Sequence, residues 1–281
     1  MLKIKKPLVS VDYLKNNFFN ENLIILDCTI PKVTANKVDV NVLKKQKIKG
    51  AVFFDIKNKF SDVNASFPNT VLSAKNFEIQ AQSLGINNES VIICYDDLGV
   101  YSSPRVWWMF HLMGFKNIAV LNGGFPDWIS KGYPIESSQK QVLSKGNFTA
   151  NFQSKKIKYT KDVLATINDE NNIVLDARSK DRFHAITPEP RKNIKGGHIP
   201  KSKSFPFTEI LVDGKMISEE KLQKKFGKIN PNKKEMIFSC GTGITASVLA
   251  LGAELSNYKN YAVFDGSWTE WASTVGLPIE K

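Results

Sequence analysis

The feature that most constrains the fold of this 281-residue chain is an internal repeat. Segments of the first half recur in the second half in the same order and at a nearly constant offset. Self-similarity on this scale indicates that a whole folding unit is duplicated. We therefore expect two similar domains, and their matching segments are LIILDC at 23–28 and NIVLDA at 172–177, VIICYD at 91–96 and EMIFSC at 235–240, AVLNGGFPDW at 119–128 and AVFDGSWTEW at 262–271, and GYPIE at 132–136 and GLPIE at 276–280.

Within each repeat, short apolar runs alternate with helical patterns. Residues 73–84 and 104–113 are the helix candidates of the first repeat, and residues 218–226 and 246–255 are those of the second. Fully apolar strands separated by helices are typical of a parallel sheet covered on both faces. The sequence therefore predicts an α/β fold with two tandem domains, each a mostly parallel sheet with helices on both faces.

A polar, lysine-rich stretch from residue 137 to residue 158 shows neither the helical nor the strand period, and is the natural connection between the repeats. We expect a first domain at 1–140, a linker at 141–158 and a second domain at 159–281. The length of the chain suits two domains of ordinary size.

The clearest chemical signal is the loop CGTGIT at residues 240–245, between a predicted strand and an alanine- and leucine-rich helix. A ligand there would lie beyond the carboxyl end of a parallel strand, where open α/β sheets hold their sites. Gly241 and Gly243 permit positive φ, so the backbone can turn consecutive N–H groups inward. These amides and the positive end of the helix dipole would stabilise Cys240 as a thiolate, with Thr242 adding a hydroxyl donor.

Two other interpretations of this loop can be compared with the sequence: an inert buried cysteine and the nucleophile of a phosphatase. Free cysteine is often inert core, but Cys240 lies at a strand–loop–helix junction in one repeat only, and the first repeat has Asp96 at the matching position. A phosphatase would want an arginine six positions after its cysteine to bind phosphate through a fork of hydrogen bonds, and that position is Ala246. A nucleophilic thiol that does not hydrolyse phosphate esters is therefore favoured.

Composition excludes several classes of function. The net charge of +12 comes from scattered lysines with few arginines and no run of five or six, so nucleic-acid binding is not expected. No apolar run approaches the roughly 18 residues needed to cross a bilayer, so no membrane partner is expected. The N-terminus has charge but no apolar stretch behind it, which favours the cytoplasm over secretion.

The remaining cysteines and the histidines carry no further chemistry in this interpretation. Cys28 and Cys94 lie in or at the end of apolar strands, and we expect them to be buried filler. The three cysteines form no CxxC pair and the three histidines are dispersed, so we expect no metal site and no cofactor.

Beyond the loop, six further segments form a recognisable series along the chain. They are GAVFFDI at 50–56, SPRVWWMF at 103–110, LDAR at 175–178, PEPR at 188–191, GHIP at 197–200 and DGSW at 265–268. With these segments the chain resembles the rhodanese superfamily, and within it the tandem-domain 3-mercaptopyruvate sulfurtransferases. The resemblance covers nearly the whole chain and implies two rhodanese-like domains, of which the second is catalytic.

The loop itself resembles the CGSGVT form associated with mercaptopyruvate, whereas thiosulfate-using rhodaneses carry an arginine and a lysine within it. Thiosulfate is a dianion that benefits from fixed cations beside the thiol, but mercaptopyruvate carries its charge on a remote carboxylate. Thr242 and Ile244 keep the hydroxyl and the branched apolar group of that form. The resemblance implies that Cys240 and Thr242 are catalytic, and that the substrate-binding loop residues are Gly241, Gly243, Ile244 and Thr245.

By the same resemblance, Arg182 and Arg191 match two arginines that bind the carboxylate and keto oxygens of the donor. A guanidinium fork suits a planar 2-oxo acid, although a surface ion pair or a solvated loop residue is the structural alternative. The implied reaction moves sulfur from 3-mercaptopyruvate to Cys240 as a persulfide and releases pyruvate. A thiol acceptor such as thioredoxin, or cyanide in an assay, then removes the sulfur.

The chain also departs from the family pattern in its first repeat. Where members often have HIPGA, residues 47–51 read KIKGA, and the usual PHMLP is replaced at residues 68–73, which read PNTVLS. A histidine and an acidic residue that would relay protons therefore have no clear counterparts, the acidic position falling at Lys57 or Asn58. Two alternatives follow: a sulfurtransferase that prefers thiosulfate, and a sulfur-carrier or binding module that turns over no small donor.

Overall fold

The computed structural model describes residues 2–30, 46–138 and 143–281. The chain divides into two compact units. Within the described ranges, none of the helices combines the length and the apolarity that crossing a bilayer requires. Unit 1 comprises Met1–Ser61, Val71–Phe152 and Asp213–Met216, and unit 2 comprises Asp62–Thr70, Gln153–Val212 and Ile217–Lys281.

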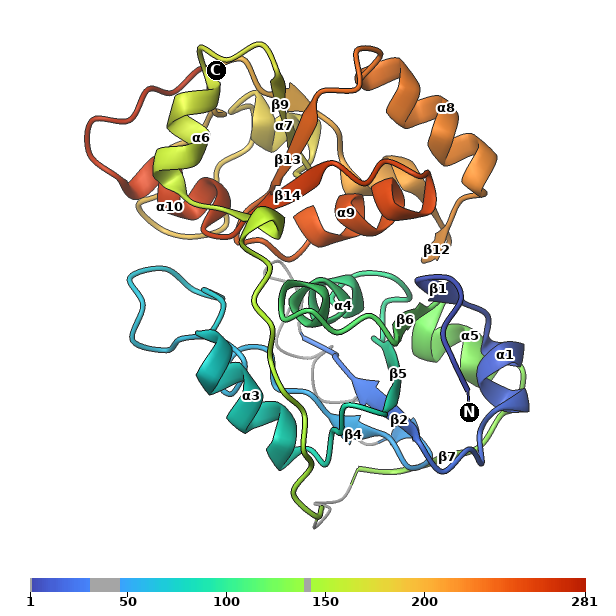
Figure 1. The fold of residues 1–281 in the computed structure, drawn as a ribbon. Helices are drawn as coiled ribbons and strands as arrows, with labels where there is room; N and C mark the ends of the chain where they lie inside the picture. Colours follow the sequence, from blue (N-terminus) through green and yellow to red (C-terminus); the bar gives the residue numbers. More distant parts are fainter. Residues whose placement is uncertain (1, 31–45, 139–142) are drawn as a thin grey trace. The chain divides into compact units, whose positions relative to one another are not determined.

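Unit 1 is built on a parallel sheet with the strand order β1-β6-β5-β2-β4 (Figure 1). All residues of β5 are buried, as expected of a central strand covered on both faces. A separate antiparallel pair is formed by β3 (Gln46–Ile48) and β7 (Ile135–Ser137). The strands of the main sheet are β1 (Leu8–Val9), β2 (Leu23–Asp27), β4 (Val52–Phe53), β5 (Val91–Tyr95) and β6 (Ile118–Leu121).

Helices cover both faces of this sheet. Leu14 of α1 and Trp128 of α5 pack in one core cluster with Ile93 of β5. On the other side, α4 lies against β5 and β6, and its Phe110 contacts Phe77 of α3 with ring centroids 5.1 Å apart. The helices of this unit are α1 (Val11–Asn16), α3 (Ala74–Ser83), α4 (Ser103–Leu112) and α5 (Gly124–Ser130).

Unit 2 repeats the plan with the strand order β10-β9-β13-β14-β8, again parallel throughout. The central pair has the same kind of register as its counterpart in unit 1, with Leu175 of β9 opposite Phe238 of β13 and Leu26 of β2 opposite Cys94 of β5. The strands of this sheet are β8 (Ile157–Lys158), β9 (Asn172–Asp176), β10 (Lys203–Ser204), β13 (Glu235–Ser239) and β14 (Tyr261–Phe264).

The second sheet is also covered on both faces. Val163 of α6 and Trp268 of α10 pack in a core cluster with Ile237 of β13. Phe226 of α8 contacts Phe238, the neighbour of Ile237 along the strand, and α9 packs against β13 and β14. The remaining elements are α6 (Thr160–Thr166), α7 (Lys180–Phe183), α8 (Glu219–Ile229), α9 (Ala246–Leu255), α10 (Ser267–Ser273), the 3₁₀ turns η1 (Ser154–Lys156) and η2 (Phe207–Ile210), and the short strands β11 (Leu211–Val212) and β12 (Lys215–Met216).

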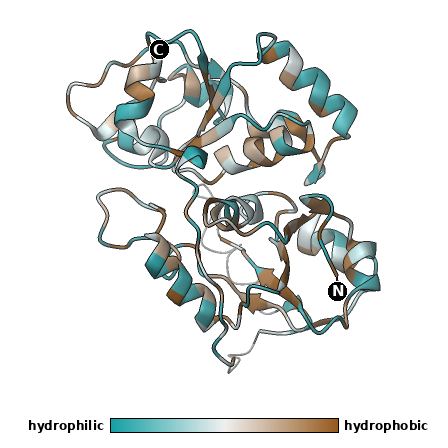
Figure 2. Ribbon diagram, in the orientation of Figure 1, coloured by the Kyte–Doolittle hydropathy of each residue, from teal (hydrophilic) through white to brown (hydrophobic). Residues whose placement is uncertain are grey.

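The predicted α/β fold with two similar parallel sheets is therefore confirmed. Figure 2 shows the pattern that made it predictable, with hydrophobic central strands and a largely hydrophilic α8. The ends of the four predicted helices agree with the structure within one residue, except at the end of α8. This helix continues past residue 226 to Ile229 because Leu222, Phe226 and Ile229 continue one helical face. The expected limits of the linker, residues 141–158, stay a prediction. The last two residues of this range form β8.

Candidate active site

Cys240 is the residue that directly follows β13, a central strand of the unit 2 sheet. The loop of residues 240–245 then leads into α9, with Thr245 at the N-cap position. The thiol thus lies at the carboxyl end of a parallel strand and before a helix N-terminus, as the sequence suggests. Cys240 is a free cysteine and only 1% of its surface is exposed.

The carbonyl groups of the loop are held by the start of α10. The amide of Trp268 donates to the Cys240 carbonyl at 3.0 Å, and the amide of Thr269 donates to the Gly241 carbonyl at 3.0 Å. Two helix-terminal N–H groups that would otherwise lack partners are satisfied in this way. Because these carbonyls point toward α10, the loop is held in one orientation.

Ser267 anchors the same loop through its amides. Its Oγ accepts hydrogen bonds from the amides of Cys240 and Gly243, each at 3.1 Å, and donates to the Phe264 carbonyl at 2.8 Å. The side chain is fully buried, and Ser267 adopts a left-handed φ of 50°, which is uncommon for a residue with a Cβ. The three hydrogen bonds stabilise this conformation.

The other amides of the loop face no partner. Within the ranges that the structure describes, no acceptor takes the N–H groups of Gly241, Thr242, Ile244 or Thr245. Gly243 has a φ of 77°, a left-handed conformation that bends the chain at the middle of the loop. Consecutive unpaired amides next to a thiol form an anion-binding concavity, which is what a thiolate or a persulfide anion needs.

At the equivalent strand–loop junction of unit 1, a carboxylate takes the place of the thiol. Asp96 follows β5 as Cys240 follows β13. Its buried carboxylate accepts hydrogen bonds from the amides of Leu98, Tyr101, Ser102 and Ser103, at distances from 2.8 to 3.0 Å, and from the Ser103 hydroxyl at 2.6 Å. This junction therefore already holds a side-chain anion in a ring of amides, and it has no nucleophile.

Both predicted substrate arginines lie beside the Cys240 loop. Arg182 belongs to α7, and Arg191 follows in the next loop. A Cβ placed on Gly241 would lie 3.3 Å from Nη2 of Arg182 and 3.8 Å from Nη1 of Arg191. Two guanidinium groups thus converge on the residue after Cys240, and a larger residue at Gly241 would press against them.

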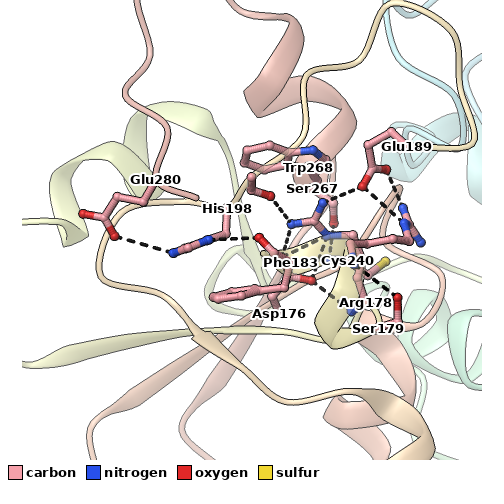
Figure 3. Close-up of polar contacts among 12 residues, drawn as sticks. Asp176, Arg178, Ser179, Phe183, Glu189, His198, Cys240, Ser267, Trp268 and Glu280 are labelled. Atoms are coloured by element: carbon pink, nitrogen blue, oxygen red, sulfur yellow. Dashed lines mark hydrogen bonds and ion pairs between the residues drawn. The ribbon is translucent and has the colours of Figure 1, made fainter. Parts of the chain in front are cut away.

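Glu189 holds Arg182 in place, and Figure 3 shows the Glu189 carboxylate next to Arg178. Its carboxylate accepts from Nε of Arg182 at 3.2 Å and from Nη2 at 2.5 Å, and also from Nη1 of Arg178 at 2.8 Å. Arg178 is buried, and it donates to Asp176 through Nη2 at 2.6 Å and stacks over Trp268 at 4.5 Å. Burial lowers the pKa of Arg178, but the two carboxylates outweigh burial and the pKa is raised overall.

A residue of the first repeat contacts the Cys240 loop as well. The segment of residues 62–70 belongs to unit 2, and Nδ2 of Asn69 donates to Oγ1 of Thr242 at 2.8 Å. Thr242 is 5% exposed. Sequence reasoning missed Asn69, Glu189 and Ser267 as members of the site, although the last two lie in the PEPR and DGSW segments.

Comparison with known proteins identifies the family. The Rhodanese-like domain matches residues 10–131 and 160–274, once in each repeat. The chain belongs to the rhodanese family. The resemblance described from the sequence is thus confirmed, together with the two-domain rhodanese fold.

Its relatives within the rhodanese family are similar over nearly the full chain. It is 35% identical over 298 residues to the mitochondrial thiosulfate/3-mercaptopyruvate sulfurtransferase 1 of Arabidopsis thaliana, covering 98% of this chain and 78% of that one. It is 31% identical over 276 residues to the 3-mercaptopyruvate sulfurtransferase of Escherichia coli K12, covering 97% of each. The crystal structure of SseA from Escherichia coli, a 3-mercaptopyruvate sulfotransferase by its description, matches with a TM-score of 0.83 and 28% identity over 94% of this chain and 99% of that one.

Proposed function

We propose that this rhodanese-family protein is a sulfurtransferase that takes sulfur from 3-mercaptopyruvate through a persulfide on Cys240. The observation that carries the proposal is the convergence of Arg182 and Arg191 on Gly241, next to the only thiol of the loop. Guanidinium groups bind planar carboxylates through paired hydrogen bonds, so a 2-oxo acid fits this position. The names of the relatives support the same donor.

In the first half-reaction, the Cys240 thiolate attacks the sulfur atom of 3-mercaptopyruvate. A sulfur–sulfur bond forms and the carbon–sulfur bond breaks, with its electron pair passing to the pyruvate enolate. The enolate then takes a proton from water and leaves as pyruvate. The loop amides stabilise the anionic sulfur before and after transfer, which is electrostatic stabilisation by groups already in place.

In the second half-reaction, an acceptor removes the outer sulfur and restores the Cys240 thiolate. We propose a protein dithiol such as thioredoxin as the acceptor, with cyanide as its substitute in an assay. A reducing compartment such as the cytoplasm would keep Cys28, Cys94 and Cys240 as the free thiols that the structure contains.

Thiosulfate is the second candidate donor, because the name of the Arabidopsis relative includes it. Against it, residues 241–245 carry no charge, so the loop places no fixed cation beside the thiol. Turnover of the two donors, measured side by side, separates the candidates. A clear preference for thiosulfate would overturn the choice of mercaptopyruvate, and turnover of neither donor would favour a sulfur-carrier module.

The role of Cys240 is tested by pyruvate release from mercaptopyruvate. Wild type and Cys94→Ala, which removes another buried thiol, are expected to release pyruvate, whereas Cys240→Ser is expected to release none above background. Equal release by wild type and Cys240→Ser would show that Cys240 is not the nucleophile.

A further inference from the structure

We propose that Asn69 is a positioning residue that directs the Thr242 hydroxyl toward the oxygen of the forming enolate. The inference rests on the proposed function and adds to it a residue from outside the second repeat. Its starting point is the 2.8 Å hydrogen bond from Nδ2 of Asn69 to Oγ1 of Thr242.

The backbone of the segment 62–70 presents Asn69 to the loop. The Asp62 amide donates to the Thr70 carbonyl at 2.8 Å, and the Thr70 hydroxyl donates to the Phe67 carbonyl at 2.8 Å, so the segment is closed on itself. Asn69 has a left-handed φ of 65°. Asparagine tolerates this conformation better than most other residues with a side chain, and it also supplies the N–H donor.

The hydrogen bond determines where the Thr242 proton can go. A threonine hydroxyl has one donor and two acceptor positions, whereas the NH₂ of an asparagine can only donate. Oγ1 therefore acts as acceptor toward Asn69, and its own proton is left for a different acceptor. Thr242 is 5% exposed, so bulk water has little access to it.

The acceptor that fits is an atom that becomes negative during the reaction. Thr242 lies two residues after Cys240, and its own amide and that of Gly241 have no acceptor among the described residues. When the carbon–sulfur bond of mercaptopyruvate breaks, the new negative charge is shared with the keto oxygen. A hydroxyl already turned toward that oxygen stabilises the transition state without giving up its proton.

This arrangement differs from an acid–base relay in a measurable way. Neither the asparagine amide nor the threonine hydroxyl changes its protonation state in the physiological pH range. The pair therefore contributes hydrogen bonding at every pH at which the enzyme is folded. Transfer from thiosulfate releases sulfite and forms no enolate, so it does not use this contribution.

The test compares Asn69→Ala, Asn69→Asp and the matched control Asn64→Asp with wild type on both donors. Asn64 lies on the same segment and is exposed. For mercaptopyruvate, we expect Asn69→Ala to lower kcat about tenfold with little change in KM. Asn69→Asp keeps the shape but offers an acceptor that captures the Thr242 proton, so its kcat should fall further. Thiosulfate turnover by Asn69→Ala, and both turnovers by Asn64→Asp, should stay within about twofold of wild type.

A double-mutant cycle shows whether Asn69 acts through Thr242. Thr242→Val removes the hydroxyl, and adding Asn69→Ala to it should cost no further activity if the two residues act as a unit. Additive losses, or wild-type kcat in Asn69→Ala, would overturn the inference. If wild type releases no pyruvate from mercaptopyruvate, the proposed function fails and this inference fails with it, whereas an active wild type with an equally active Asn69→Ala contradicts the role of Asn69 alone.

Discussion

Glu189 accepts two hydrogen bonds from the guanidinium of Arg182, at 3.2 Å from Nε and 2.5 Å from Nη2. The same carboxylate accepts from Arg178, whose side chain is fully buried, while 24% of the Arg182 side chain is exposed. Glu189 thus joins a buried arginine to one that borders the Cys240 loop. None of the hydrogen bonds described above joins Glu189 to residues 240–245, so we expect Glu189 to affect this loop only by orienting Arg182.

Glu189→Gln should therefore weaken substrate binding. A glutamine keeps one acceptor oxygen, like the Oε1 that accepts from both arginines, but it replaces Oε2 with an NH₂ donor and removes the negative charge, so Nη2 of Arg182 loses its partner. We expect KM for mercaptopyruvate to rise by roughly five- to twentyfold, with a loss of about 1–3 kcal/mol in the free energy of unfolding. Glu209→Gln is the control, because Glu209 forms more exposed ion pairs with Lys180 and Lys225. An unchanged KM would contradict this role for Glu189.

A second prediction concerns Ser267 and the shape of the Cys240 loop. Its hydroxyl is the acceptor for the amides of Cys240 and Gly243, so Ser267→Gly removes that acceptor while tolerating the left-handed φ. Because the loop serves every donor, we expect kcat/KM to fall about tenfold for mercaptopyruvate and for thiosulfate alike. Ser273→Ala, at the exposed end of the same helix, should have no effect. A loss confined to one donor would argue against a shared loop geometry.

We expect the loss of either arginine beside Gly241 to affect the two sulfur donors unequally. Arg182→Ala and Arg191→Ala remove groups that match a carboxylate, so we expect the kcat/KM for mercaptopyruvate to fall about 10- to 100-fold, and that for thiosulfate to fall less. Lys192→Ala removes an exposed charge one residue from Arg191 and controls for general electrostatics. Steady-state kinetics on both donors checks this, and equal losses would indicate that the arginines serve folding.

The pH dependence of stability can be predicted at Glu254. Burial alone would raise the pKa of this carboxyl, but hydrogen bonds from Lys259 and Tyr261 outweigh burial and lower it from its ordinary value of 4.5. A lowered pKa in the folded state means that Glu254 contributes stability above about pH 4.5 and loses it as the pH falls through the folded-state pKa. Thermal melts from pH 7 to pH 3 should show a steeper loss for wild type than for Glu254→Gln. Glu220→Gln, on an exposed part of α8, should follow wild type.

The central part of the fold could be predicted because its signals are local. The strands β2, β5, β9 and β13 are continuous apolar runs, and the repeat between them shows that they occupy equivalent places. The edge strands β1, β4, β8 and β10 have two residues each, too few to show a period. Their place in the sheets follows from pairing with a neighbour, which the pattern of a single segment does not show.

The residues of the candidate site also differ in whether local sequence signals predict them. Cys240 is predicted from its strand–loop–helix junction, and Arg182 and Arg191 are predicted from the family resemblance. Asn69 and Thr242 are 173 residues apart in sequence, and the contact between them depends on where the segment 62–70 lies in the folded chain. No periodicity or spacing contains that information.

The central claim is that Cys240 carries the transferred sulfur, and mass spectrometry of the protein after treatment with 3-mercaptopyruvate tests it most directly. We expect a gain of about 32 Da, one sulfur atom on the thiolate, located on the peptide that contains Cys240 and lost on adding cyanide. Wild-type protein that releases pyruvate without this gain, or that carries the sulfur on Cys28 or Cys94, would contradict it.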